Sequence, residues 1–136
     1  MEKNLFVVPT NHIHQFWHLA EKHLQRAIDT GNGEFTIDQL RQFIAQGNST
    51  LLLVMDNNGN SHGAVTVQWV NYPNDYVAYV TYLGGKDILK IFNQFELWAK
   101  NNGATKIQCS TGHENLIRLY QRYKFKPKYT LMEYKL

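Results

Sequence analysis

The sequence is poor in cysteine and in long apolar runs, and each of these shortages excludes a class of protein. Cys109 is the sole cysteine, so no internal disulfide can form and a reducing cytoplasm is the natural setting. The longest apolar run, residues 51–55, is too short for a membrane-spanning helix. The first four residues lack the basic and apolar segments of a signal peptide. We therefore expect a cytoplasmic protein.

Aromatic residues are plentiful by contrast, with three Trp, eight Tyr and seven Phe. Together they supply much of the area that a core must bury, and a chain of 136 residues is long enough for one such core. The sequence shows no linker, internal repeat or low-complexity segment. We predict that residues 1–136 form a single domain.

The charge is small overall but unevenly distributed. The net charge is +3, yet residues 100–136 carry eight Lys or Arg against two Glu. A basic C-terminal third fits an anionic ligand, either a phosphorylated cofactor or a nucleic acid, and also fits an ordinary solvated surface. The nucleic-acid alternative rests on this charge alone, because the sequence has no recognised nucleic-acid-binding motif.

The apolar pattern alternates between the period of a strand and that of a helix. Turn residues at 31–33, 57–60 and 73–75 separate the segments. The predicted order is strand 5–8, a helix from Asn11, a helix from Thr36, strands 50–55, 63–72 and 76–83, a helix over 88–99, strand 106–110, helix 113–123 and strand 128–136. Because a helix between two strands of one sheet makes a crossover to a parallel neighbour, we predict an α+β fold: a mixed sheet of about six strands with helices on both faces.

The last predicted helix carries the most specific motif. Residues 113–120 read His-Glu-Asn-Leu-Ile-Arg-Leu-Tyr, and Lys-Phe follows at 124–125. This resembles the pattern of the GCN5-related N-acetyltransferase (GNAT) superfamily, which reads Asn, three variable residues, Ile, any residue, Leu-Tyr and, further on, Gly-Phe. Agreement occurs at Ile117, Leu119, Tyr120 and Phe125, whereas His113 and Lys124 depart from the pattern. The predicted order of elements is similar to the same superfamily over nearly the whole chain.

The segment before the third helix departs from the family pattern. Members of the superfamily usually carry Arg or Gln, two residues, Gly, one residue, then Gly or Ala, whereas residues 83–88 read Leu-Gly-Gly-Lys-Asp-Ile. We read Gly84, Gly85 and Lys86 as a turn that opens a helix and points backbone N–H groups at a phosphate. The chain resembles a short, degenerate member of the superfamily, such as the GNAT-like proteins of bacteriophages.

The resemblance implies acetyl-CoA as acyl donor, bound between strands 76–83 and 106–110. Its pantetheine amides would pair with the backbone of Val80, Tyr82 and Leu83, and its pyrophosphate would bind the N–H groups of residues 84–88. The implied cofactor-binding set is Val80, Tyr82, Leu83, Gly84, Gly85, Lys86, Asp87, Ile88, His113, Arg122 and Lys124. Asp87 argues against this reading, because a carboxylate in the first turn competes with a phosphate. His113 fits either a cofactor contact or a helix cap.

Tyr120 is the best catalytic candidate, because in the resembling enzymes this position protonates the departing CoA thiolate. The alternative is an ordinary core aromatic, since Leu116, Tyr120 and Tyr123 recur at helical spacing. We find no convincing general base for the acceptor amine, although Tyr82 is able to polarise a water molecule. No carboxylate or cysteine completes a metal site with the N-terminal histidines, so we expect no metal.

Two functions therefore stay open. The first is an acetyl-CoA-dependent N-acyltransferase that transfers the acetyl group directly to an unidentified amine, in a pocket shaped by residues 30–36. The second is a catalytically lapsed GNAT-like module that binds another protein, which the altered phosphate loop and the missing base favour. A homodimer or a protein partner is compatible with both.

Overall fold

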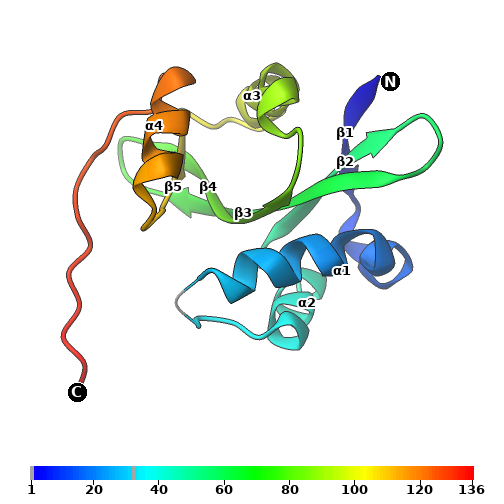
Figure 1. Cartoon of the computed structure of the whole chain (residues 1–136), viewed down its shortest axis with the longest axis horizontal. Coiled ribbons are helices and arrows are strands. Elements are labelled where there is room, and N and C mark those ends of the chain that lie inside the picture. Colours follow the sequence, from blue (N-terminus) through cyan, green and yellow to red (C-terminus); the bar gives the residue numbers. More distant parts are fainter. Residues whose placement is uncertain (1, 32) are drawn as a thin grey trace.

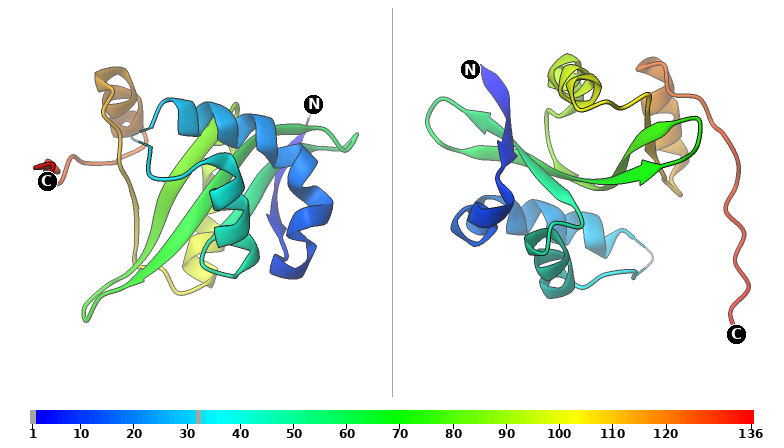
Figure 2. Two further views of the ribbon diagram at one scale, coloured as in Figure 1. Left: turned by 90° about the horizontal axis from the view of Figure 1, so that it is seen from below. Right: turned by 180° about the vertical axis from the view of Figure 1, so that it is seen from behind.

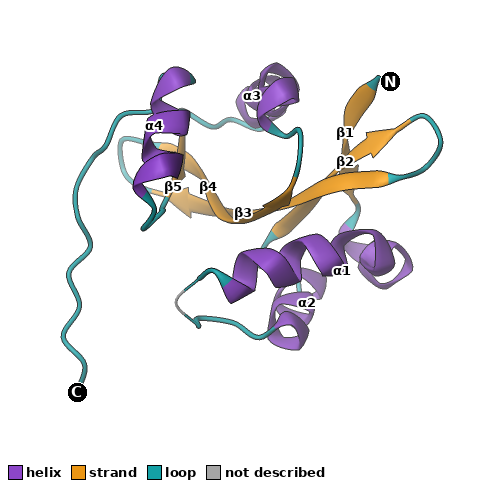
Figure 3. Ribbon diagram, in the orientation of Figure 1, coloured by secondary structure: helices purple, strands orange, loops and turns teal. Residues whose placement is uncertain are grey.

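A computed structural model of the chain describes residues 2–31 and 33–136. One five-stranded sheet lies between two layers of helices (Figure 1; Figure 3). The strands are β1 Lys3–Val8, β2 Thr50–Asp56, β3 Ser61–Asn71, β4 Tyr76–Gly85 and β5 Lys106–Cys109. The helices are α1 Ile13–Asp29, α2 Ile37–Ala45, α3 Phe92–Asn101 and α4 Glu114–Arg122, with short 3-10 turns η1 Thr10–His12 and η2 Leu89–Ile91.

The strands lie in the sheet in the order of the sequence. Strands β1 to β4 are antiparallel neighbours, whereas β5 is parallel to β4. The change of direction follows from α3, because a helix between two strands returns the chain to the end where the first strand began. The predicted mixed sheet with helices on both faces is confirmed.

The predicted strand at residues 128–136 is wrong, and the sheet has five strands rather than about six. Residues 126–136 run extended away from the sheet (Figure 2). Alternating apolar residues favour an extended backbone, but an extended segment becomes a strand only when a neighbour accepts its hydrogen bonds. In this structure no described segment pairs with residues 126–136.

Helices α1 and α2 cover one face of the sheet, and α3 and α4 cover the other (Figure 2). The first layer buries a cluster that includes Trp17 and Leu24 of α1, Ile44 of α2 and Leu53 of β2. The second layer is smaller and centres on Phe95 and Ala99 of α3. Alternate residues of β2 serve both clusters, since Leu53 faces α1 and Leu52 faces α3.

Short polar contacts explain where the elements begin and turn. Helix α2 begins with a capping box, in which Thr36 Oγ1 accepts the Gln39 N–H at 3.2 Å and Gln39 Oε1 accepts the Thr36 N–H at 2.9 Å. The predicted turn at residues 57–60 joins β2 to β3, and Asp56 Oδ1 accepts the Asn58 and Asn60 N–H groups at 2.8 and 3.1 Å. These contacts join residues that are close in the sequence, which is why the sequence predicted both the start of α2 and the turn at residues 57–60.

Helix α1 lies directly on the backbone of β4. A Cβ atom at Gly84 would lie 1.8 Å from the His23 carbonyl oxygen, so only glycine permits this approach. Gly85 has a φ of 88°, and a Cβ there would lie 2.5 Å from the His62 carbonyl oxygen. The two glycines end β4, and the α-helix begins only at Phe92. The prediction that they open the helix is therefore wrong, because contacts with α1 and β3 hold them in the strand.

Candidate functional site

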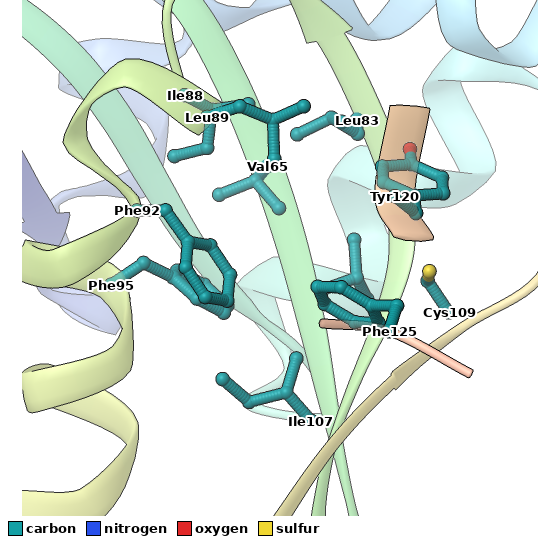
Figure 4. A pocket seen from close by; sticks show the side chains of 11 residues that line it. Val65, Leu83, Ile88, Leu89, Phe92, Phe95, Ile107, Cys109, Tyr120 and Phe125 are labelled. Atoms are coloured by element: carbon teal, nitrogen blue, oxygen red, sulfur yellow. The ribbon is translucent and has the colours of Figure 1, made fainter. Parts of the chain in front are cut away.

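An apolar pocket opens between β4, β5, α3 and α4. Its empty volume is about 360 Å³, a figure that includes space open to solvent. Aromatic and aliphatic side chains line it: Val65, Val80, Leu83, Ile88, Leu89, Phe92, Phe95, Ile107, Cys109, Tyr120 and Phe125 (Figure 4). The Tyr120 hydroxyl is one of the few polar groups that line the pocket.

The pocket lies where two parallel strands separate. Pairing between β4 and β5 runs from Val77 opposite Lys106 to Val80 opposite Cys109 and stops there. Strand β4 continues to Gly85, whereas β5 ends at Cys109. Beyond Val80 no described strand pairs with this side of β4. Its backbone is therefore available to a ligand that carries amide groups.

Two threonines hold a bulge in β4 at the point of separation. Thr66 of β3 lies opposite Tyr82, its neighbour Val67 lies opposite Val80, and Thr81 is the extra residue. The fully buried Thr66 Oγ1 accepts the Tyr82 N–H at 3.0 Å and lies 2.6 Å from Thr81 Oγ1. Thr81 Oγ1 donates to the Thr66 carbonyl oxygen at 3.2 Å. Side-chain hydroxyls thus replace the ladder bonds that the bulge disrupts.

Tyr120 of α4 reaches into the pocket. Its ring lies 5.6 Å from that of Phe125, and its hydroxyl points toward Leu83 (Figure 4). Burial, together with the nearby Cys109, raises the pKa of Tyr120 above its ordinary value. Burial also raises the pKa of the Cys109 thiol. Both groups are therefore neutral near pH 7, and Tyr120 keeps a proton that it can donate.

Tyr82 lies on the opposite face of β4, so the structure does not bring the two candidate tyrosines together. Its ring packs edge-on against Phe35 at 6.2 Å, among the side chains of the α1 and α2 layer. Burial and then the charge of Glu34 raise the pKa of Tyr82, which opposes ionisation. Phe35 and Glu34 belong to the predicted acceptor loop, residues 30–36, of which Asn32 is outside the described residues.

The predicted phosphate loop is partly occupied by protein contacts. The Lys86 N–H donates to the His62 carbonyl oxygen at 2.7 Å. The Asp87 carboxylate pairs with Lys3 at 2.5 Å and Lys90 at 3.1 Å, and these hydrogen bonds lower its pKa to about 2. Asp87 has a φ of 72°, and its carbonyl oxygen begins η2 by accepting the Lys90 N–H at 3.1 Å.

This arrangement leaves the loop with a positive balance. Lys3 and Lys90 pair with the single carboxylate of Asp87, and Lys86 precedes it in the sequence. Within the described part of the chain, the N–H groups of Asp87 and Ile88 donate no hydrogen bond. The competition between Asp87 and a phosphate, which the sequence suggested, is therefore reduced because two lysines already neutralise that carboxylate.

The other predicted cofactor contacts lie on α4 and just beyond it. His113 occupies the N-cap position of α4, but its side chain makes no capping hydrogen bond. Arg122 and Lys124 are exposed at the far end of the helix, and Lys124 has a φ of 71°. The end of α4 meets the start of α3, since the Phe92 ring lies 6.0 Å from that of Tyr123.

Sequence reasoning missed the residues that shape the site. Thr66 and Thr81 are ordinary strand residues in the sequence, and no local signal marks a bulge. Lys3 lies far from Asp87 along the chain, so its ion pair with Asp87 has no sequence signature. The same holds for Ser110, whose hydroxyl bonds to that of Tyr79 where the strands separate.

Residues 2–31 and 33–136 contain no candidate metal site and no candidate membrane-spanning helix. No three His, Cys, Asp or Glu side chains come together there as possible metal ligands. His14, part of the histidine-rich segment, instead accepts a hydrogen bond from Arg41 at 3.0 Å. No helix in these residues is both long and apolar enough to cross a bilayer.

Solved structures with a similar fold include several acetyltransferases. The aminoglycoside acetyltransferase HMB0005, from an uncultured soil metagenomic sample, is 14% identical with a TM-score of 0.72, over 100% of this chain and 99% of its own. Another from such a sample, meta-AAC0020 in complex with sisomicin, is 11% identical with a TM-score of 0.71, over 98% and 96%. Aminoglycoside N-acetyltransferase AAC(6')-Iy in complex with CoA is 13% identical with a TM-score of 0.68, over 99% and 95%.

These identities are low, so the similarity establishes the fold alone. The chain has the GNAT acetyltransferase fold that its last helix resembled, over essentially its full length. No model of a known protein family matches the sequence, and no curated protein matches it. The fold is thus known from three-dimensional structure and from the short motif at residues 113–125.

Proposed function

We propose that residues 1–136 act as one cytoplasmic acyltransferase domain, which transfers an acetyl group from acetyl-CoA directly to an amine. The observation that carries this proposal is the separation of β4 from β5 beside an apolar pocket that the Tyr120 hydroxyl enters. An exposed strand edge suits the amides of a pantetheine chain, and the apolar walls suit its methylene groups. Binding of CoA by a structural neighbour supports the same donor.

The backbone of Val80, Tyr82 and Leu83 would hold the pantetheine arm in this proposal. The bulge at Thr81 supports this role, because it changes the register of β4 against β3 where the free edge of β4 begins. Gly84 and Gly85 would contribute through the close packing of α1 against β4 rather than through a turn. They would fix the end of the strand beside which the cofactor lies.

The pyrophosphate would bind beside η2. The N–H groups of Asp87 and Ile88 and the positive balance of Lys3, Lys86 and Lys90 support this assignment. Arg122 and Lys124 would reach the 3′-phosphate, because the end of α4 lies beside the start of α3. His113 would contact the cofactor from the other end of α4.

Catalysis would use the two faces of β4. The amine would approach from the α1 and α2 side, where Tyr82 and the Glu34 carboxylate would orient it or its water. The amine nitrogen would form a bond to the thioester carbonyl carbon and lose a proton to the water that Tyr82 orients, and the carbon–sulfur bond would break. Tyr120, which is protonated near pH 7, would give its proton to the departing thiolate. The neutral Cys109 argues against an acyl-cysteine intermediate.

A lapsed, protein-binding module is the second candidate. One observation favours it: among the described residues, no carboxylate or histidine hydrogen-bonds to Tyr82. Tyr82 therefore has no partner that could act with it as a general base for the amine. Calorimetric titration with acetyl-CoA distinguishes the two candidates. Micromolar affinity supports the acyltransferase, whereas no binding at millimolar ligand supports the module. Weaker binding of CoA that lacks the 3′-phosphate would implicate Arg122 and Lys124.

The catalytic role of Tyr120 has its own test. We expect Tyr120→Phe to lower turnover by roughly 10²–10⁴-fold and to leave the affinity for acetyl-CoA nearly unchanged. Turnover is followed as free CoA thiol, with aminoglycosides among the first amines tried because structural neighbours are aminoglycoside acetyltransferases. Tyr72→Phe, at a tyrosine that is 52% exposed on the β3–β4 turn, is the matched control. Equal turnover of the two variants would remove Tyr120 from the mechanism.

A further inference from the structure

Uncharged polar residues form a row across three strands, beside the point where β4 and β5 separate. Gln68 of β3 lies opposite Tyr79 of β4, and Tyr79 lies opposite Gln108 of β5. Neighbouring strands of a sheet are about 4.8 Å apart, so these three positions are adjacent. Ser110 follows the end of β5, and its hydroxyl is hydrogen-bonded to that of Tyr79. These four residues are here called the polar row.

The polar row faces the α1 and α2 side of the sheet. The residues that flank it in the three strands pack on the α3 and α4 side: Val67 and Trp69 in β3, Ala78 and Val80 in β4, and Ile107 and Cys109 in β5. Because successive side chains of a strand alternate between the two faces, Gln68, Tyr79 and Gln108 point the other way. Gln68 and Ser110 are exposed, and Tyr79 and Gln108 are half-buried. The row is therefore accessible to a solute.

Most of the hydrogen-bonding capacity of the polar row is unused. The bond between Tyr79 and Ser110 takes one hydrogen and one lone pair of the two hydroxyls. Within the described part of the chain, the side-chain amides of Gln68 and Gln108 have no hydrogen-bond partner. An amide donates two hydrogens and accepts at its oxygen, and a hydroxyl both donates and accepts. Such an array suits a ligand with several hydroxyl groups, since each of these also donates and accepts.

The polar row carries no charge of its own. Lys106, two residues before Gln108 on the same side of β5, has its Nζ 2.9 Å from Asp75 Oδ2, and the two charges offset each other. A carboxylate or phosphate on the ligand would thus find no unpaired cation in the row. The row therefore favours a ligand whose polar groups are uncharged hydroxyls.

The row ends where the proposed reaction would take place. In the proposed function the pantetheine arm runs along β4 from the phosphate loop toward Val80, so the thioester would lie where the strands separate. Val80 is the last residue of β4 that pairs with β5, and Ser110 follows its partner Cys109. Tyr120 reaches this region from the α3 and α4 side. An amine held at Ser110 would therefore meet the thioester from the side opposite to Tyr120.

We propose that the polar row binds the acceptor and that the acceptor is an amino sugar. This assignment rests on the proposed function and names its substrate class. The Ser110 oxygen accepts a hydrogen bond from the amine, which turns the nitrogen lone pair toward the thioester carbon. The amides of Gln68 and Gln108 bond the ring hydroxyls. Tyr79 is a positioning residue, because its hydroxyl holds Ser110 in one of the three rotamers open to a serine.

Two amines with six-membered rings test the class of acceptor. Glucosamine carries hydroxyl groups around its ring, and cyclohexylamine carries none. We expect kcat/KM, calculated for the free amine and followed as CoA thiol, to be roughly 10-fold or more higher for glucosamine, since one hydrogen bond contributes up to about tenfold. Equal values, or no acetylation of glucosamine by a protein that binds acetyl-CoA, would overturn this assignment and leave the donor unaffected. Absence of acetyl-CoA binding would overturn the proposed function as well.

Variants of the polar row test the residues themselves. The double variant Gln68→Leu/Gln108→Leu should lower the ratio of kcat/KM for glucosamine to that for cyclohexylamine roughly 10-fold. Tyr76→Phe, at a tyrosine of β4 that stacks on Trp69 on the opposite face, is the matched control and should leave the ratio unchanged. Calorimetric titration of glucosamine into the CoA-saturated protein gives the same comparison without turnover. An unchanged ratio and affinity in the double variant would contradict the assignment.

A double-mutant cycle tests whether Tyr79 acts through Ser110. Ser110→Ala should lower kcat/KM for glucosamine roughly 10-fold, and Tyr79→Phe should cause a smaller loss. The variant with both changes should be no worse than Ser110→Ala alone, because Tyr79 has nothing left to position. Melting temperature and acetyl-CoA affinity should stay unchanged, whereas a purely structural link between β4 and β5 would lower both. Losses that multiply in the double variant would show that Tyr79 does not act through Ser110.

Discussion

The two faces of the sheet differ in how tightly their helices pack against them. Each face together with its helices is here called one half of the molecule. On the α1 and α2 side, Trp17, Leu24, Ile44 and Leu53 are each at most 3% exposed. On the side of α3 and α4, Phe95 is buried, but α4 and β5, all of whose residues are described, have no fully buried residue. The well-packed half holds the fold together, and the incompletely packed half has the pocket.

This difference has a physical reason. A close-packed interface between helix and sheet leaves no space for a ligand, and an unfilled one sacrifices packing energy to provide it. The strands β4 and β5 separate beside the pocket, and α4 contributes Tyr120 to its wall. Changes in the first half should therefore affect stability, whereas changes in the second should affect ligand binding.

The largest effect is expected in the well-packed half. Leu24→Ala, at a fully buried position in α1, should lower the free energy of unfolding by about 2–5 kcal/mol through lost burial and the cavity it leaves. Ile117→Ala, at a partly exposed position in α4, should cost no more than about 1 kcal/mol. Urea unfolding of both variants measures the difference. Equal losses would show that the two halves are equally packed.

Gly84→Ala tests the close packing of α1 against β4, the strand that separates the two halves. The added Cβ would lie 1.8 Å from the His23 carbonyl oxygen, so α1 must move away from β4, at about 1–3 kcal/mol. Gly112→Ala, where no atom lies within 4 Å of the new Cβ, is the matched control and should change little. Thermal melting compares them. Full stability of Gly84→Ala with lost acetyl-CoA affinity would instead assign Gly84 to the cofactor alone.

The smallest effect concerns pH and His23, which lies 6% exposed between α1 and β4. Burial first, and then the charges of Lys22, Arg26 and His62, lower its pKa, against a hydrogen bond to the Ser61 carbonyl oxygen at 3.3 Å. Its Nδ1 has no hydrogen-bond partner among the described residues. As the pH falls through 6.5, the unfolded chain therefore takes up a proton that the folded chain resists, and stability falls.

Melting temperatures between pH 7.5 and 5.5 measure this loss. We expect His23→Gln to flatten the pH dependence relative to the unchanged protein. His18→Gln, at an exposed histidine of the same helix, should leave the dependence as it was. If both variants retain the same slope, His23 is not the group that titrates.

Prediction of the fold from the sequence succeeded where the signal is local. The period of apolar residues predicted each of the four α-helices and the strands up to β5, because burial of one face imposes that period on any helix or strand. The strand predicted at residues 128–136 was wrong. Apolar residues do alternate there, but no described strand pairs with the segment. The GNAT resemblance was found through Ile117, Leu119 and Tyr120, which lie within one helix turn or so of each other.

The sequence by itself determined the order of the elements, the motif of α4 and the basic charge of the C-terminal third. These depend on neighbours along the chain. Only the tertiary structure decided that Thr66 holds the β4 bulge, that Lys3 neutralises Asp87 and that Gly84 admits α1. It also decided that Tyr82 and Tyr120 face opposite sides of β4, since one extra residue at Thr81 shifts the alternation of side chains. Such contacts join residues remote in sequence, and no local pattern records them.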